Sequence, residues 1–199
     1  MITIRKIICL CSGGLDSFVL VNFFKNLNYQ IEILFVDYGQ LSNLKEFEGV
    51  QKIGKFLKIN DILKIEIKNY GSLFSNSLID HKEFINDFFP ARNLILLTIA
   101  ASICYEKKIQ EIGIGIINSN RIFPDCTEEF FINLEKIFKI ALNYNIGIQK
   151  PLENFSKRDI IDYLKKYNLP MNITYSCQKG KEFHCKKCPS CIERLNALH

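Results

Sequence analysis

The chain has 199 residues, of which 48% are hydrophobic and 24% are charged, and its formal net charge is +5. This length supports one compact domain with a sizeable core, and the composition excludes a disordered or low-complexity protein. The small positive excess is spread along the chain, which argues against a dedicated nucleic-acid-binding stripe. No apolar run is long enough for a secretory signal or a membrane span, so we expect a cytoplasmic protein without membrane contact.

Strand and helix patterns alternate over the first third of the chain. Residues 5–11 form an apolar run typical of a buried strand, and residues 15–27 follow with helical spacing. A second strand over 31–36, a second helix over 44–57 and a third strand over 61–67 continue the alternation. This pattern predicts a parallel sheet of the doubly wound α/β type.

The remaining elements follow after an interruption. Residues 68–90 are polar and rich in Phe, which predicts a loop or lid. We then expect a buried helix over 91–105, a strand over 111–117 and a long amphipathic helix over 125–144. A last helix over 156–167 begins with a serine that is a good capping residue.

The first strand and the first helix are joined by Ser-Gly-Gly-Leu-Asp-Ser, from Ser12 to Ser17. The two glycines allow a tight turn and a close approach of the backbone to an anion, and the following helix directs its free N–H groups there. The two serines can donate hydroxyl groups, and Asp16 suits a magnesium ion that bridges to phosphate. The spacing fits neither the Walker loop nor the dinucleotide fingerprint, so the loop predicts another kind of phosphate site.

Four of the eight cysteines cluster near the C-terminal end with the spacing C-x7-C-x2-C-x2-C. They are Cys177, Cys185, Cys188 and Cys191. Four thiolates at this spacing suit a structural zinc ion, whereas C-x2-C-x2-C can also hold an iron–sulfur cluster. We favour zinc because the fourth cysteine completes a tetrahedral set, which leaves no place for His184 as a ligand.

The cysteine cluster also bears on organisation and compartment. Thiols gathered at metal-ligand spacing favour a reducing compartment over a secreted, disulfide-bonded protein. We expect an α/β domain over residues 1–172, followed by a small zinc-binding segment over residues 173–199.

Three shorter motifs lie between the loop and the cysteines. They are Asp-Tyr-Gly-Gln at residues 37–40, Pro-Ala-Arg-Asn at residues 90–93 and Pro-Asp-Cys at residues 124–126. Together with the Ser-Gly-Gly-Leu-Asp-Ser loop and the cysteine segment, in this order, they resemble the 7-cyano-7-deazaguanine synthase family. The loop itself resembles the PP-loop of the ATP pyrophosphatase superfamily, to which that family belongs.

The resemblance implies an α/β fold of the PP-loop ATP pyrophosphatase type and a defined reaction. A member would convert 7-carboxy-7-deazaguanine and ammonia to the nitrile through an adenylated carboxylate and an amide, releasing AMP and pyrophosphate. It implies ATP as co-substrate, magnesium, one structural zinc ion per chain and a homodimer. Direct tRNA binding is not expected, because 199 residues leave little room for an added RNA-binding domain.

The resemblance also assigns roles to individual residues. ATP would bind Cys11, Ser12, Gly13, Gly14, Leu15, Asp16, Ser17, Tyr38 and Gln40. Asp16, Ser17 and Arg92 would be catalytic, and Arg92, Asn93 and Asp125 would bind the deazaguanine substrate. Two alternatives stay open: Arg92 could be a surface arginine at a helix start, and Asp125 could be the N-cap of the long helix.

Two stretches depart from the family pattern where nucleotide or substrate would bind. Residues 118–123 read Asn-Ser-Asn-Arg-Ile-Phe in place of Asp-Tyr-Ser-Gly-Tyr, and Leu41-Ser42 replaces Arg-His. Adenylation therefore remains the expected chemistry, while the nitrogen acceptor is open. The alternatives are an enzyme that couples the adenylated carboxylate to another acceptor such as a protein amine, a PP-loop tRNA-modifying enzyme, and a zinc-bearing interaction module without activity.

Overall fold

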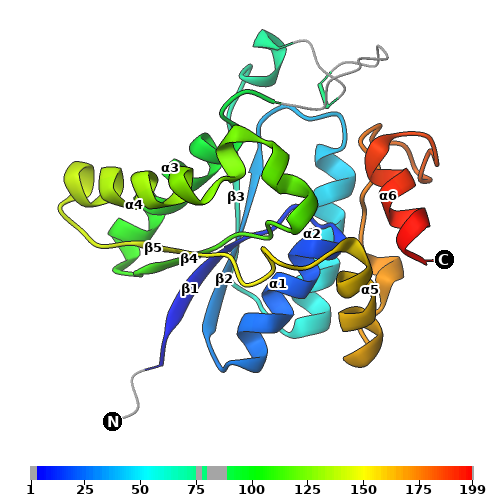
Figure 1. Ribbon diagram of the computed structural model, residues 1–199, viewed down its shortest axis with the longest axis horizontal. Coiled ribbons are helices and arrows are strands. Elements are labelled where there is room, and N and C mark those ends of the chain that lie inside the picture. Colours follow the sequence, from blue (N-terminus) through cyan, green and yellow to red (C-terminus); the bar gives the residue numbers. More distant parts are fainter. Residues whose placement is uncertain (1–3, 75–77, 80–88, 199) are drawn as a thin grey trace.

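A five-stranded parallel sheet forms the centre of the computed structural model, which describes residues 4–74, 78–79 and 89–198 (Figure 1). The strand order is β3-β2-β1-β4-β5, and every neighbouring pair is parallel. The strands are β1 (Lys6–Leu10), β2 (Gln30–Asp37), β3 (Ile62–Glu66), β4 (Glu111–Gly113) and β5 (Gly147–Gln149).

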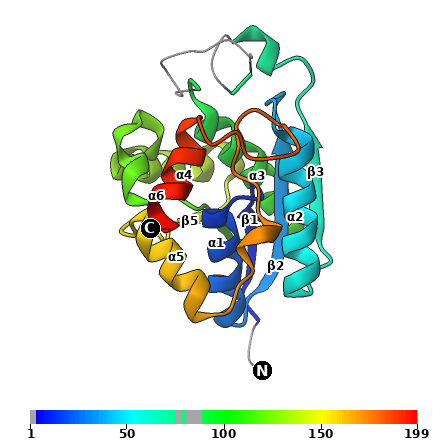
Figure 2. The same cartoon turned by 90° about the vertical axis from the view of Figure 1, so that its right-hand side faces the viewer.

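Helices cover both faces of the sheet, which confirms the predicted doubly wound architecture. Figures 1 and 2 show α1, α2 and α5 on one face, with α3 and α4 on the other. The last helix, α6, lies beside α5 in both views. The helices are α1 (Leu15–Asn26), α2 (Asn43–Leu57), α3 (Arg92–Lys107), α4 (Glu128–Leu142), α5 (Lys157–Lys166) and α6 (Pro189–Leu198).

The sheet divides the hydrophobic interior into two cores. Successive side chains of a strand point to opposite faces, so Ile7 and Cys9 of β1 join the core under α1, α2 and α5. Ile8 and Leu10 join the core under α3 and α4. The strands β1 and β2 are buried on both faces, as expected for a parallel sheet covered by two helical layers.

Four elements differ from the sequence expectation. The strand expected over 111–117 ends at Gly113, and β5 was not predicted because three residues give too short a hydrophobic pattern. The helix expected from residue 125 begins at Glu128, because the Thr127 hydroxyl caps it by accepting from Phe130 N at 3.2 Å. The cysteine segment contains α6, a helix that was not predicted because the cysteine spacing indicated a metal-binding loop.

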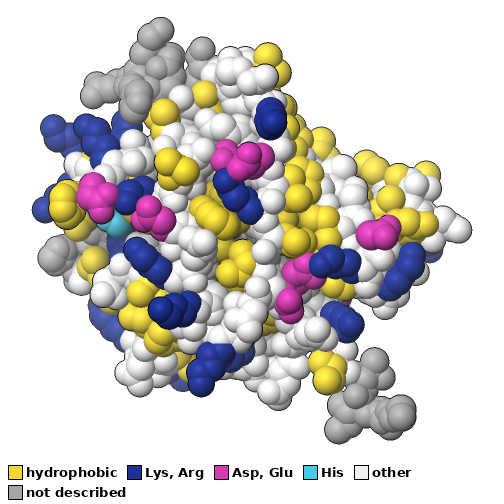
Figure 3. Space-filling model, turned by 180° about the vertical axis from the view of Figure 1, so that it is seen from behind, with side chains coloured by type: hydrophobic (Ala, Val, Ile, Leu, Met, Phe, Trp, Pro, Cys, Tyr) yellow, Lys and Arg dark blue, Asp and Glu magenta, His cyan; other side chains and the backbone are white. Residues whose placement is uncertain are grey.

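The interruption after β3 begins as a loop with one short 3₁₀ turn, Gly71–Leu73. Much of the predicted loop or lid over 68–90 lies outside the described residues, at 75–77 and 80–88. Within the ranges that the structure describes, no helix is long and apolar enough to cross a membrane. On the face shown in Figure 3, Lys and Arg side chains are interspersed with acidic and apolar ones.

Candidate active site

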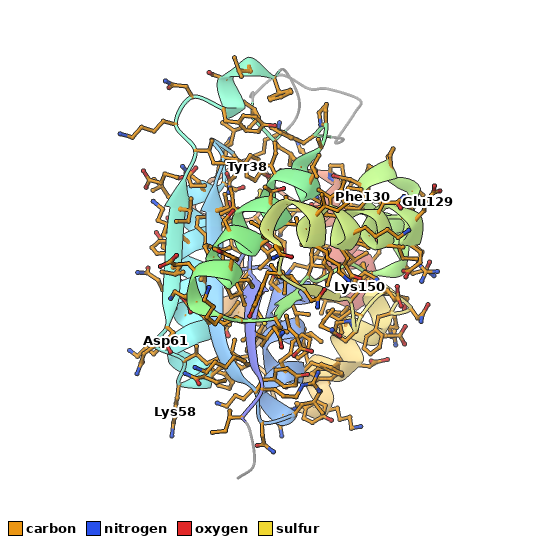
Figure 4. The ribbon with its side chains drawn as sticks, turned by 90° about the vertical axis from the view of Figure 1, so that its left-hand side faces the viewer. Tyr38, Lys58, Asp61, Glu129, Phe130 and Lys150 are labelled. Carbon is orange, nitrogen blue, oxygen red and sulfur yellow. The ribbon has the colours of Figure 1, made fainter. Side chains whose placement is uncertain are left out.

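The carboxyl-terminal ends of the central strands open into a cleft with a volume of about 600 Å³. Ligands bind at this edge of an open parallel sheet, beside the point where the strand order reverses. That point lies next to β1, which has β2 on one side and β4 on the other. Figure 4 shows Tyr38 at this edge, whereas Lys58 and Asp61 lie at the opposite edge.

The loop after β1 forms one wall of the cleft. The predicted ATP-binding residues that line it are Cys11, Ser12, Gly14, Leu15, Asp16, Ser17, Tyr38 and Gln40. Ser12 N donates to Ser17 Oγ at 3.1 Å, and the two hydroxyl oxygens are 3.0 Å apart. Among the described side chains none caps α1 at Gly14, so the first N–H groups of this helix stay available to an anion.

Gly13, the remaining predicted ATP residue, lies behind this wall and sets the shape of the loop. Its φ of +76° is a left-handed conformation that favours glycine, and a Cβ there would meet the Glu46 carbonyl oxygen at 2.3 Å. A Cβ on Gly49 would in turn lie 2.9 Å from the Gly13 oxygen. The two glycines therefore allow α2 to pack directly against the phosphate loop.

Asp16 at the start of α1 is paired with a lysine that the sequence interpretation did not include. Lys157 Nζ lies 2.8 Å from both carboxylate oxygens of Asp16 and 3.2 Å from Glu193 Oε2. Burial raises the pKa of Asp16, although the Lys157 ammonium acts to lower it. Burial acts to lower the pKa of Lys157, but Asp16 and Glu193 outweigh it and raise that pKa.

The position of Lys157 was a signal that sequence reasoning could have used. Ser156, the predicted capping serine, forms a capping box with Asp159, which makes Lys157 the first residue of α5. A cation at that end of a helix is unfavourable against the helix dipole. Lys157 is held there because its ammonium reaches carboxylates of α1 and α6, and such a misplaced charge marks a candidate site residue.

The turn after β2 is organised by a buried carboxylate, Glu46, that sequence analysis also did not single out. Glu46 accepts from Gln40 Nε2 at 2.9 Å and from Ser42 Oγ at 2.7 Å, and it lines the cleft. Gln40 Oε1 also accepts from Tyr38 N at 2.9 Å, so a hydrogen bond within the turn holds its shape. Burial raises the pKa of Glu46 against the hydrogen bonds from Gln40 and Ser42, which lower it.

The predicted substrate residues meet at the start of α3. Arg92 and Asn93 line the cleft, and the Arg92 guanidinium interacts with the Tyr38 hydroxyl, whose pKa burial raises to about 12. Asp125 Oδ2 accepts from Asn93 N at 2.9 Å, and Asn93 Nδ2 donates to the Asp125 carbonyl at 3.0 Å. Asp125 thus caps α3. The alternative role, N-cap of the long helix, belongs to Thr127 and not to Asp125. Substrate binding by Asp125 stays a prediction.

The unusual stretch before α4 forms a 3₁₀ turn, Asn118–Ile122, along the cleft. Ser119, Asn120, Ile122 and Phe123 line the cleft. Asn120 Oδ1 accepts from Ile117 N at 2.9 Å and fixes the turn, and Ser119 Oγ donates to Glu193 Oε1 at 3.0 Å. Phe123 is half-buried beside this turn, whereas Phe35 of β2 is buried in the core.

The four predicted metal ligands come together at the N-terminal end of α6. The sulfur atoms of Cys177, Cys185, Cys188 and Cys191 all lie within 4.8 Å of one another. A tetrahedral zinc ion with Zn–S bonds of about 2.3 Å needs sulfurs about 3.8 Å apart, so the cluster fits a metal of this kind. None of the eight cysteines, all within the described residues, forms a disulfide.

The surroundings of the cysteines also suit thiolates. The backbone N–H of Cys185 donates to Cys177 Sγ at 3.4 Å, and that of Cys188 donates to Cys185 Sγ at 3.3 Å. His184 accepts from Ser176 N through Nε2 at 3.2 Å and stands outside the ligand group, as expected. Backbone donors of this kind orient and stabilise metal-bound sulfur.

The cysteine segment is joined to the phosphate loop. Tyr175 N donates to the Gly13 carbonyl at 2.9 Å, and Lys45 of α2 lies 2.7 Å from Glu182. Arg194 of α6 donates to Thr174 Oγ1 and to the Met171 carbonyl, both at 2.8 Å. One wall of the cleft therefore belongs to the cysteine segment.

The parallel sheet and the loop at the end of β1 define a PP-loop ATP-using enzyme. Two solved structures share the fold. A U34-tRNA thiolase, NcsA from Methanococcus maripaludis with its [4Fe-4S] cluster, matches with a TM-score of 0.57 and 16% identity, over 97% of this chain and 63% of its own. An NH3-dependent NAD synthetase from Campylobacter jejuni matches with a TM-score of 0.55 and 17% identity, over 86% of this chain and 67% of its own.

Within that class, the model of the family described as queuosine biosynthesis protein QueC matches residues 6–199, and the chain belongs to this family. The 7-cyano-7-deazaguanine synthase of Campylobacter fetus subsp. fetus is 31% identical, over 100% of this chain and 94% of its own. That of Picrophilus torridus is 35% identical, over 97% of this chain and 87% of its own. The expected family is thereby confirmed.

Proposed function

We propose that the chain makes 7-cyano-7-deazaguanine from 7-carboxy-7-deazaguanine, ammonia and two molecules of ATP. The names of its relatives support this, since the chain covers most of their length. The observation that carries the proposal is the cleft itself, in which the Asp16–Lys157 pair and Arg92 line the same space as the phosphate loop. The site thus offers cations to both a triphosphate and a carboxylate.

The reaction needs two activations. A carboxylate oxygen of the substrate attacks the α-phosphorus of ATP, pyrophosphate leaves, and ammonia then displaces AMP from the acyl carbon to give the amide. The amide oxygen then attacks the α-phosphorus of a second ATP and a second pyrophosphate leaves, after which departure of AMP with loss of both amide protons gives the nitrile. Each step has negative charge on departing phosphate, which fixed cations and N–H donors stabilise.

The residues of the chain have distinct tasks in this scheme. The Ser12 and Ser17 hydroxyls and the N-terminus of α1 would hold phosphate oxygens, and Lys157 would neutralise the departing pyrophosphate. Arg92 would hold the substrate carboxylate or the α-phosphate, and Asn93 would support it. Asp16 fits magnesium because its carboxylate reaches the cleft with 26% of the side chain exposed. A bound magnesium ion would supply further charge neutralisation on the triphosphate.

The four-cysteine site is proposed to hold zinc in a structural role. The mutual sulfur spacing and the four-thiolate set support a closed site with no position left for substrate. A colourless protein with one zinc ion per chain is expected from metal analysis. A brown, iron-loaded protein prepared without air would contradict this assignment.

The experiment that tests the function is incubation with ATP, magnesium, 7-carboxy-7-deazaguanine and ammonia, followed by mass spectrometry. The nitrile together with AMP and pyrophosphate is the expected result. Asp16→Ala should abolish AMP formation, and Asp162→Ala, on the exposed side of α5, is the matched control. Absence of ATP turnover in the wild-type protein would rule out the proposal.

A second candidate keeps the adenylation and changes the acceptor. The 3₁₀ turn over Asn118–Ile122 is the observation that favours it, because this departure from the family pattern lines the cleft. AMP release without amide or nitrile, recovered as a conjugate when a protein amine is supplied, would select this candidate. Transfer to tRNA would instead select a tRNA-modifying enzyme. The homodimer and the lack of direct tRNA binding remain predictions.

A further inference from the structure

We propose that Glu193 of α6 is the positioning residue for Lys157, holding its ammonium at the phosphate site when Asp16 turns to the magnesium ion of MgATP. This inference rests on the proposed ATP-dependent function and deepens it. It assigns a role in the ATP site to Glu193, a residue of α6 to which the family resemblance gives no role.

The geometry begins with the two partners of the ammonium group. Lys157 Nζ is held at 2.8 Å by both oxygens of Asp16 and at 3.2 Å by Glu193 Oε2. The Lys157 side chain is only 15% exposed, so few water molecules can replace a lost partner. Two carboxylates from α1 and α6 therefore fix one ammonium group of α5, and the two views in Figures 1 and 2 place these helices together.

The two carboxylates are not equivalent. Asp16 belongs to the phosphate loop and is the carboxylate proposed for magnesium, so it must give up part of its contact with Lys157 when MgATP enters. Glu193 comes from outside the loop and can keep its contact. Without Glu193, an unpaired and flexible lysine side chain would have to be ordered again at the cost of its rotamer entropy.

Glu193 is itself held in place. Its second oxygen, Oε1, accepts from Ser119 Oγ at 3.0 Å, so each carboxylate oxygen has its own partner. The next residue, Arg194, fixes α6 through Thr174 Oγ1 and the Met171 carbonyl. The carboxylate thus joins three parts of the cleft: α5, the 3₁₀ turn before α4 and the helix that carries Cys191.

The test is a double-mutant cycle on the dissociation constant of MgATP, measured by calorimetry without any acid substrate. Glu193→Gln should weaken MgATP binding about tenfold, the loss expected for one hydrogen bond between charged groups. In a Lys157→Ala background the same change should instead leave binding equal or tighter, because it only removes a negative charge near the triphosphate. Glu193→Asp should give an intermediate constant.

Asp162→Asn is the matched control, because it removes one charge from the helix that carries Lys157, but Asp162 pairs with the exposed Arg158. It should change MgATP binding in neither background. Metal content and melting temperature are measured on every sample, and if Glu193→Gln does not fold, Glu193→Asp and Ser119→Ala make the same comparison. Equal effects of the Glu193 change with and without Lys157 would overturn the proposal.

The two hypotheses fail separately. A wild-type protein that binds MgATP but does not turn over 7-carboxy-7-deazaguanine would overturn the proposed function and leave the coupling of Glu193 to Lys157 intact. A protein that forms the nitrile, but in which the Glu193 and Lys157 changes affect MgATP binding independently, would overturn the role of Glu193 and leave the proposed function intact.

Discussion

Lys157 shows how much of the cleft depends on a single side chain. It pairs with Asp16 of the phosphate loop and Glu193 of α6, and it is the first residue of α5. Its charge opposes the dipole of its own helix, so its place is explained by the cleft and not by the local sequence.

Lys157→Ala should lower the rate of AMP formation about 100-fold or more, because a fixed cation facing a departing phosphate stabilises the negative charge that develops in the transition state. The rate is measured as AMP released per enzyme at saturating MgATP. Lys165→Ala, an exposed lysine on the same helix, is expected to leave the rate unchanged. A Lys157→Ala enzyme with the wild-type rate would show that Lys157 has no role in the reaction.

Cys11 lines the cleft beside the phosphate loop, yet we expect it to be unreactive. Burial raises the pKa of its thiol to about 12 from 9.0, which lowers the thiolate fraction at neutral pH about 1,000-fold. Iodoacetamide should therefore label Cys11 in folded protein far more slowly than in protein unfolded in urea, with the rate rising tenfold per pH unit. Mass spectrometry of the labelled peptides measures this, and equal rates in the two states would contradict it.

The site residues predicted from the sequence are those that belong to recognisable motifs, whereas residues that reach the cleft singly from other elements were missed. Ser12 to Ser17 form one local motif, and their positions on the cleft wall follow from a strand–turn–helix unit. Lys157, Glu193 and Glu46 belong to other elements, and nothing in a single sequence states which helix ends will face one loop. The helix dipole around Lys157 was the one local signal.

At the scale of elements, the contact between the phosphate loop and α2 depends on two glycines. Gly13→Ala would place a methyl group 2.3 Å from the Glu46 carbonyl oxygen at a φ of +76°, so either the loop or α2 must move. We expect a loss of about 2–3 kcal/mol in the free energy of unfolding and weaker MgATP binding.

Urea unfolding and calorimetry measure these two effects. Gly147→Ala in β5 is the control, since the nearest atom to its added Cβ lies at 3.5 Å and its conformation suits alanine. A Gly13→Ala protein as stable as the control would show that the loop can relax away from α2.

Element prediction from the sequence succeeded where the pattern was long. The first two strands and all the helices that cover the sheet have clear hydrophobic periods, and the order of elements predicted the doubly wound fold. β5 has three residues and receives its place from pairing with β4, a tertiary contact with little local signal. α6 was hidden because two of its ten residues are Pro189 and Cys191, which suggested a metal loop.

At the scale of the whole molecule, the cysteine segment packs against the phosphate loop and the main core. Tyr175 bonds to Gly13, and Ala197 of α6 belongs to the core under α1, α2 and α5. Removing the metal with a chelator should therefore lower the melting temperature and weaken MgATP binding together, because folding of such a segment is coupled to its metal.

Scanning calorimetry and MgATP titration measure the two effects, and adding zinc back should restore both. Cys188→Ser should reproduce the loss without a chelator. A protein stripped of metal that still binds MgATP with the wild-type constant would show that the segment is independent of the ATP site.

The hydrogen bond from Tyr175 to the Gly13 carbonyl also bears on how the protein is made in the cell. The phosphate loop leaves the ribosome before the residues that complete its wall, up to Glu193. Contacts between distant parts of a chain form late, after the entropy of closing a long loop has been overcome. A nascent chain therefore has no finished nucleotide site until Glu193 has left the ribosome, so MgATP can stabilise only chains that already extend past this residue.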